Sequence, residues 1–174
     1  NVPAYGGRVY KFKTSQKSMN SDEFIMNEHN KDEFPPAHTA EHLLNQTMIR
    51  MFGCGRSNNA HIERKKSKMS YVLDHKPTRK EEKEIESRMN ELIADDLPVT
   101  YEFVDKDNLP QGISVDKLPG DVSQKVRLVR IGDYDVCPCI GKHVRSTAQI
   151  GRFELLGTNW DEASHTFRVR FKIV

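Results

Sequence analysis

Two pairs of possible metal ligands stand toward opposite ends of the sequence, and both pairs have the same spacing. His38 and His42 are separated by three residues, and Cys139 and His143 repeat that separation far along the chain. Imidazole nitrogen and thiolate sulfur are donors that Zn²⁺ takes, and a tetrahedral site needs four of them. The four residues therefore predict a zinc site that the fold assembles from distant segments. They are also our candidates for catalysis.

The histidine pair lies in a segment that the sequence predicts to be helical. We expect the helix to begin just after Pro35-Pro36 and to end at Gly53. Its core-facing stripe follows the helical period, at Ala40, Leu43, Leu44, Thr47, Met48 and Met51. At about 100° per residue this stripe lies roughly opposite His38 and His42. The histidines are therefore expected to face a cleft or another layer rather than the main core.

The second pair lies in a loop that follows an expected strand. The segment from Cys139 to His143 contains Gly141, whose lack of a side chain would let the backbone curl both donors inward. Asp135, just before this loop, could accept a hydrogen bond from a ligating imidazole. The simpler expectation for Asp135 is an exposed aspartate of a hairpin.

The remaining pattern predicts a mostly antiparallel α+β domain. Thr78 and Glu81 form a capping-box pattern at the start of a second helix. Strands are expected at residues 59–64, 69–74, 99–104, 125–131, 134–136, 152–156 and 166–174. Two main helices packed on such a sheet make a two-layer α+β fold. We divide the chain into a lead segment, 1–34, with a possible short strand at 8–12, and a zinc-binding domain, 35–174.

Composition limits the classes of function. The chain has 174 residues, of which 36% are hydrophobic and 30% are charged. No apolar run approaches the roughly 18 residues that span a bilayer, so no membrane partner is expected. Three cysteines are an odd count, which favours a reducing, cytoplasmic location over a disulfide framework. The net charge of +2 leaves nucleic-acid binding to be judged from local clusters.

Two places offer cations for contacts to RNA phosphates. Arg64, Lys65 and Lys66 lie together at an expected turn between strands. Arg145 follows His143 closely, so the ligand would fix its position. For both places a solvated surface is an equally good interpretation.

The metal-ligand segments resemble a known family. His38-Thr39-Ala40-Glu41-His42-Leu43-Leu44 and the segment Cys139-Ile140-Gly141-Lys142-His143-Val144, together with the tail that ends at Gly151, are similar to the second additional domain of alanyl- and threonyl-tRNA synthetases. The resemblance to free-standing alanyl-tRNA editing proteins is stronger still, and it spans roughly residues 36–156. It implies an editing fold, Zn²⁺ on the four ligands, and hydrolysis of the ester that links a wrong amino acid to tRNA.

Two other functions compete with this one. In the first, zinc only fixes the fold, and the cationic turn docks RNA or protein without catalysis. In the second, His38-x-x-Glu41-His42 is an inverted zinc-peptidase motif with Glu41 as the general base. That motif needs another carboxylate ligand, for which Glu86 and Glu91 are the candidates. Our expectation for Glu41 itself is a solvated helix side chain.

Overall fold

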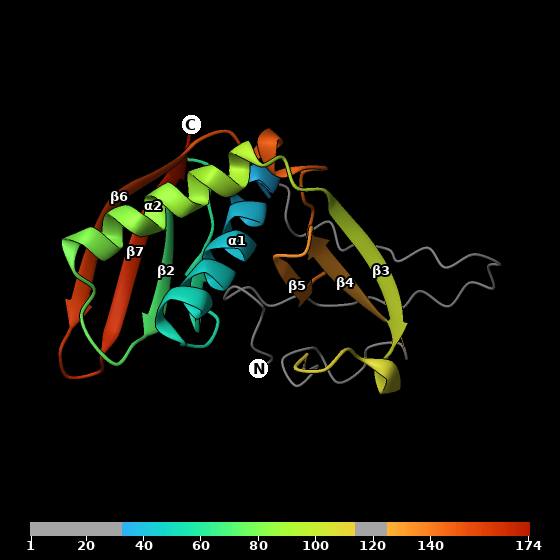
Figure 1. The fold of residues 1–174 in the computed structure, drawn as a ribbon, viewed down its shortest axis with the longest axis horizontal. Helices are drawn as coiled ribbons and strands as arrows, with labels where there is room; N and C mark the ends of the chain where they lie inside the picture. Colours follow the sequence, from blue (N-terminus) through green and yellow to red (C-terminus); the bar gives the residue numbers. More distant parts are fainter. Residues whose placement is uncertain (1–32, 114–124) are drawn as a thin grey trace.

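The computed structural model describes residues 33–113 and 125–174. The predicted lead segment and its possible strand at 8–12 therefore lie outside the described residues, except for residues 33 and 34. Within the described part, the helices and strands form an α+β fold with two antiparallel sheets (Figure 1). The predicted fold class is confirmed.

The larger sheet has four strands in the order β1-β2-β7-β6. Their bounds are β1 (Asn59–His61), β2 (Ser67–Val72), β7 (Thr166–Ile173) and β6 (Phe153–Asp161). Alternate residues of the central strands point into the core, among them Tyr71, Phe167 and Phe171, which are at most 1% exposed. The strands predicted at 152–156 and 166–174 pair with each other, and β6 extends further than predicted.

Two helices cover one face of this sheet (Figure 1). Helix α1 spans Pro35–Phe52 and helix α2 spans Arg79–Ala94. The capping box of α2 is present: Thr78 accepts from the Glu81 backbone, and the Glu81 side chain accepts from the Thr78 backbone. The apolar stripes of both helices are buried in one core, as their spacing predicts.

The first helix begins slightly earlier than predicted. Pro35 and Pro36 are its first residues rather than its preceding turn. Proline fits the first turn of a helix, because the N–H that it lacks has no partner there. The helix ends as predicted at Gly53, whose φ of 65° is the left-handed conformation that glycine adopts at low cost.

The smaller sheet has three strands in the order β3-β4-β5. Their bounds are β3 (Val99–Asp105), β4 (Lys125–Ile131) and β5 (Asp135–Pro138). Strands β4 and β5 form the predicted hairpin, in which Gly132 has a φ of 49°. In Figure 1 this sheet lies on the other side of α1 from the larger sheet. Helix α1 is therefore covered on two sides.

A short 3-10 helix, η3 (Thr147–Ile150), ties the smaller sheet's C-terminal loop to the end of α2. The Thr147 hydroxyl donates to the Leu92 carbonyl and accepts from the Leu97 backbone. The Val99 backbone in turn donates to the Arg145 carbonyl. These bonds fix the loop that carries His143 against the end of α2 and the start of β3. None of the helices in the described residues is long and apolar enough to cross a bilayer.

Candidate metal centre

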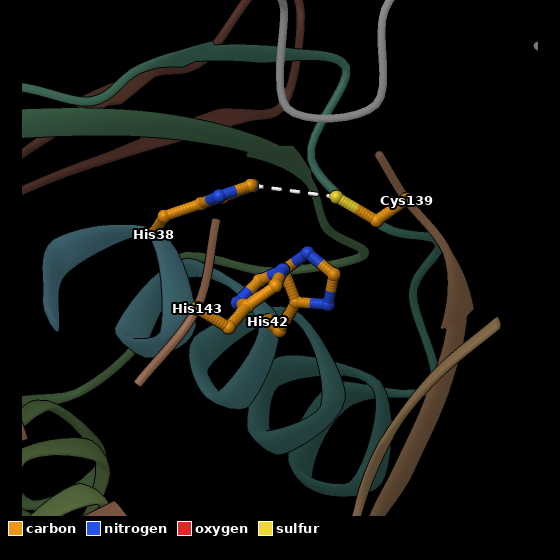
Figure 2. A group of neighbouring side chains, drawn as sticks. All are labelled: His38, His42, Cys139 and His143. Atoms are coloured by element: carbon orange, nitrogen blue, oxygen red, sulfur yellow. Dashed lines mark hydrogen bonds between the residues drawn. The ribbon is translucent and has the colours of Figure 1, made fainter. Parts of the chain in front are cut away.

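The four predicted ligands converge on one point between α1 and the loop after β5. His38, His42, Cys139 and His143 each offer a donor atom, and these atoms all lie within 4.8 Å of one another. Figure 2 shows the four side chains turned toward a common centre. His38, His42 and Cys139 are 2 to 3% exposed, and His143 is only partly buried. The ligand set predicted from spacing is thus assembled by the fold.

The inner contacts of the cluster involve the sulfur and stacked rings. Cys139 Sγ lies 3.5 Å from His38 Nε2 (Figure 2). The His143 ring stacks on that of His38 at a centroid distance of 4.2 Å, and it meets the His42 ring edge-on at 4.5 Å. Each ring therefore has one side directed into the cluster.

His38 is held from outside the cluster by Glu33 and the backbone. Its Nδ1 lies 3.0 Å from Glu33 Oε1 and 3.1 Å from the Lys142 carbonyl oxygen. Glu33 also accepts from the Lys142 backbone at 2.8 Å. A carboxylate facing Nδ1 favours the tautomer with its hydrogen there, which leaves Nε2 as a donor for a metal.

His143 is held from outside by a residue of α1. Its Nδ1 lies 3.0 Å from Thr39 Oγ1, which also accepts from the Val144 backbone at 3.2 Å. A hydroxyl oxygen has two lone pairs, so Thr39 can accept from both groups. Nε2 of His143 then faces the cluster with its lone pair free.

His42 faces a buried carboxylate. Its Nδ1 lies 3.8 Å from Asp135 Oδ2, and Asp135 is only 2% exposed. Arg56 donates to both oxygens of Asp135 at 2.8 and 3.0 Å, and Gln46 donates to Oδ1 at 3.0 Å. Our expectation of an exposed hairpin aspartate was wrong. The hairpin packs against α1, and Arg56 supplies the charge that lets the carboxylate be buried.

The loop that carries Cys139 is shaped by Gly141 and Arg127. A side chain at Gly141 would overlap the His38 ring, because even a Cβ would lie inside contact distance. Arg127 donates to the Cys139 carbonyl at 2.7 Å and to the Gly141 carbonyl at 2.5 Å. Glycine at position 141 therefore lets the loop backbone lie against His38, where a larger residue would clash. The two Arg127 hydrogen bonds hold this backbone in place.

The three imidazoles have different electrostatic environments. Burial lowers the pKa of His42 and of His143 well below the usual value, and repulsion from neighbouring cationic groups lowers it further. Burial also acts to lower the pKa of His38, but the charge of Cys139, together with Glu33 and Glu41, raises it well above the usual value. Two rings are thus held neutral, the form that binds a metal, and the third is paired with the sulfur.

The arrangement fits a zinc ion on observations of this structure alone. Nε2 of His143 is buried and has no hydrogen-bond partner among the described residues. Burying a nitrogen atom without a hydrogen-bond partner costs free energy. A metal ion bound to Nε2 would account for this burial. Imidazole nitrogen and thiolate sulfur are donor types that zinc takes, and four donors are the number in a tetrahedral site. His38, His42, Cys139 and His143 would hold the ion.

The structure does not support the peptidase motif, either at Glu41 or at the carboxylates predicted to complete it. Glu41 is 3% exposed, so the expected solvated side chain was wrong, and its carboxylate lies 3.8 Å from His38 Nε2. Glu86 instead accepts from the Leu155 backbone at 2.7 Å, and Glu91 accepts from Ser87 at 3.3 Å. Neither supplies the carboxylate ligand that the peptidase motif needs. Cys139 and His143, rather than a carboxylate of α2, lie beside the two histidines.

Sequence reasoning missed most of the groups that orient the ligands. Glu33, Thr39, Arg56 and Arg127 have no motif of their own. Only Thr39 carried a weak signal, because it stands between the two histidines in sequence. The others reach the site from separate elements, so their proximity depends on the tertiary fold.

The cations predicted to bind RNA are not part of the four-residue cluster. Arg64 stacks on the ring of Phe34, just before α1, at 4.3 Å. Lys65 and Lys66 are exposed in the turn between β1 and β2, and Arg145 is exposed beyond His143. Arg64 and Arg145 therefore lie in segments that adjoin the ligand-bearing elements.

Comparison with known proteins finds similarity to tRNA-synthetase and tRNA-editing proteins. Residues 126–169 match the family model of the threonyl and alanyl tRNA synthetase second additional domain. The matched residues include Cys139 and His143, and the predicted resemblance to alanyl-tRNA editing proteins is confirmed.

Individual relatives are similar over most of this chain. The alanyl-tRNA editing protein AlaX-L of Pyrococcus horikoshii is 32% identical over 136 residues, which are 77% of this chain and 32% of that protein. The alanine–tRNA ligase of Halorubrum lacusprofundi is 32% identical over 131 residues, 74% of this chain and 14% of the ligase. That of Treponema denticola is 29% identical over 117 residues, 67% of this chain and 20% of the ligase. The chain thus spans a third or less of each.

Proposed function

We propose that this chain is a zinc-dependent aminoacyl-tRNA deacylase, which hydrolyses the ester between a wrong amino acid and its tRNA. The observation that carries the proposal is the convergence of His38, His42, Cys139 and His143 within 4.8 Å. The similarity to an alanyl-tRNA editing protein supplies the substrate class. The catalytic domain would be residues 35–174. Cys54, Cys137 and Cys139 form no disulfide with one another, which suits a cytoplasmic location.

Ester hydrolysis needs stabilisation of the negative charge that develops on the carbonyl oxygen. A bound zinc ion supplies Lewis-acid chemistry at this point. The chain's own residues set the conditions: burial keeps His42 and His143 neutral, and Gly141 keeps the loop close to His38. Cys139, with its sulfur 3.5 Å from His38 Nε2, would hold the ion as a thiolate beside that imidazole.

A substrate would approach from the side of His143, which is less buried than the other ligands. The Tyr101 ring lies 6.4 Å from the His143 ring and is 45% exposed. Arg145 is exposed beyond His143. Arg64 stacks on Phe34 just before α1, and Lys65 and Lys66 follow it, exposed in the same turn. We assign these cations to the phosphates near the aminoacylated end of tRNA.

The test uses purified protein with measured zinc content and a panel of mischarged tRNAs. Seryl- and glycyl-tRNA specific for alanine head the panel, with correctly charged alanyl-tRNA as the reference. We expect deacylation of at least one mischarged tRNA, and loss of turnover in His42→Ala. A zinc-loaded wild type that cleaves neither mischarged tRNA nor a simple aminoacyl ester would refute the proposal.

A second candidate is a zinc-stabilised module that binds RNA or protein without catalysis. Its support is that four protein donors fill a tetrahedral ion, and three of them are almost fully buried, as in structural zinc sites. The same panel separates the candidates. Zinc-dependent folding and tRNA binding without turnover would establish the module.

A further inference from the structure

We propose that Asp135 is a positioning residue for His42, and that Arg56 and Gln46 hold its carboxylate in the orientation this requires. The inference rests on the metal site of the proposed function. It concerns how the site is prepared, so it is tested separately from turnover.

The first step concerns His42 itself. It is 2% exposed, and its Nδ1 is a buried polar atom without a hydrogen bond among the described residues. The acidic oxygen facing this atom is Asp135 Oδ2 at 3.8 Å. This separation is too long for a hydrogen bond but short enough for electrostatic attraction between a carboxylate and an N–H group.

The second step concerns the carboxylate. Asp135 has no exposed side-chain surface, so its negative charge needs partners. Arg56 donates one N–H to each oxygen, and Gln46 donates to Oδ1. An ionised carboxylate offers about four lone-pair sites, and these bonds occupy three. Among the contacts of the described residues, the site left over is on Oδ2, the oxygen that faces His42.

The third step concerns the effect on the ligand. A carboxylate beside Nδ1 stabilises the neutral tautomer that carries its hydrogen on Nδ1. The lone pair then lies on Nε2, the nitrogen on the other side of the ring. Glu33 and Thr39 lie beside Nδ1 of His38 and of His143, each at 3.0 Å, which is closer than Asp135 lies to His42. Each histidine of the cluster thus has its own outer partner, and Asp135 supplies the third.

Arg56 adds a second requirement. Its positive charge balances Asp135, so the pair brings no net charge next to the metal ligands. Arg56 and Gln46 therefore hold the Asp135 carboxylate beside His42 without adding net charge to the cluster.

The experiment compares Asp135→Asn with wild type by two readouts. The first is zinc affinity, measured by competition with a chromophoric chelator, where loss of an outer partner weakens binding by about 10- to 100-fold. The second is the ¹⁵N spectrum of His42 in metal-free protein, which reports where the ring hydrogen lies. We expect the Nδ1–H tautomer in wild type and a shift toward Nε2–H in the variant. Glu154→Gln, which removes a surface ion pair with Arg152 and Lys172, is the matched control.

Several outcomes would overturn the inference. One is an Asp135→Asn protein that folds and keeps zinc affinity within about twofold of wild type. Another is an unchanged His42 tautomer. Should Asp135→Asn fail to fold, Asp135→Glu keeps the charge but displaces the carboxylate. The Asp135→Glu variant should then lose zinc affinity without a matching loss of thermal stability. If both fall together, Asp135 has only a structural role and the inference fails. Because the spectrum needs neither zinc nor turnover, a chain that deacylates nothing still tests Asp135.

Discussion

The hydroxyl of Thr39 joins the two distant ligand segments directly, because its Oγ1 lies 3.0 Å from His143 Nδ1. Thr39 belongs to α1, and it stands between His38 and His42 in sequence. The Val144 backbone donates to the same oxygen at 3.2 Å. One fully buried side chain of the histidine helix thus sets both the position of the C-terminal loop and the orientation of its ligand.

Replacing Thr39 by valine should weaken zinc binding by about tenfold or more, because His143 loses the partner that orients it. The shape of the side chain is nearly kept, so the helix should remain folded. Chelator competition measures the loss, and Thr39→Ser, which retains the hydroxyl, should bind zinc almost as wild type does. Equal affinities in the valine and serine variants would show that the hydroxyl has no role in the site.

Replacing Gly141 by alanine should displace His38 or the loop, since the added Cβ would overlap the imidazole ring. Overpacking of this kind costs about 1–3 kcal/mol of unfolding free energy. Thermal unfolding of metal-free protein and zinc stoichiometry together measure the effect. Gly55→Ala is the matched control, because a Cβ there meets no atom within 4 Å. If both variants unfold alike and both bind zinc, the steric argument fails.

Zinc should raise the stability of the fold, because the ligands come from segments that only the folded chain brings together. Free zinc at about 100 times its dissociation constant adds about 2.7 kcal/mol if the unfolded chain binds none. Calorimetry or chemical unfolding with zinc and with a chelator measures the difference. His42→Ala should show a much smaller dependence on zinc. A wild-type melting temperature that is indifferent to zinc would contradict the four-ligand site.

The capping box of α2 gives a prediction away from the metal centre. Thr78→Ala should cost about 1 kcal/mol of unfolding free energy, because the Glu81 backbone N–H loses its acceptor. The pKa of Glu81 is lowered by the hydrogen bond from the Thr78 backbone. Its contribution is therefore present above the unfolded value of about 4.3 and is lost as pH falls through the folded pKa. Urea unfolding at several pH values measures both effects.

Glu81→Gln separates the two parts of that prediction. The amide oxygen can still accept from the Thr78 backbone, but it does not ionise. The variant should keep much of the cap while losing its share of the acid-side pH dependence. A pH dependence equal to that of wild type would mean that Glu81 does not contribute it.

The assigned tRNA cations predict a change in salt dependence. Arg145→Ala should weaken tRNA binding and reduce the slope of log affinity against log salt by a little under one unit, as for one lost phosphate contact. Filter binding at several salt concentrations measures the slope. Arg152→Ala, an exposed arginine paired with Glu154, is the control that should leave it unchanged. An unaltered slope in Arg145→Ala would remove that residue from the interface.

Much of this protein could be read from sequence because the signals are local. The spacing of His38 and His42 places both on neighbouring turns of one helix, whatever that helix packs against. Thr78 and Glu81 form their cap within one turn of chain, and the alternation around Tyr71 follows from the geometry of a single strand. The ligand types added the chemistry, since imidazole and thiolate together suit zinc.

Only the tertiary structure decided how these local pieces meet. The helical stripe placed His38 and His42 away from the main core, but the smaller sheet and its loop cover that face and bury them. Asp135 was expected to be exposed, because no local pattern shows its ion pair with Arg56. That pair joins segments far apart in sequence. Burial and ion pairing depend on which surfaces pack together. No single segment carries that information, so the environment of each candidate ligand depends on the fold. The candidate ligands themselves could be predicted from the sequence.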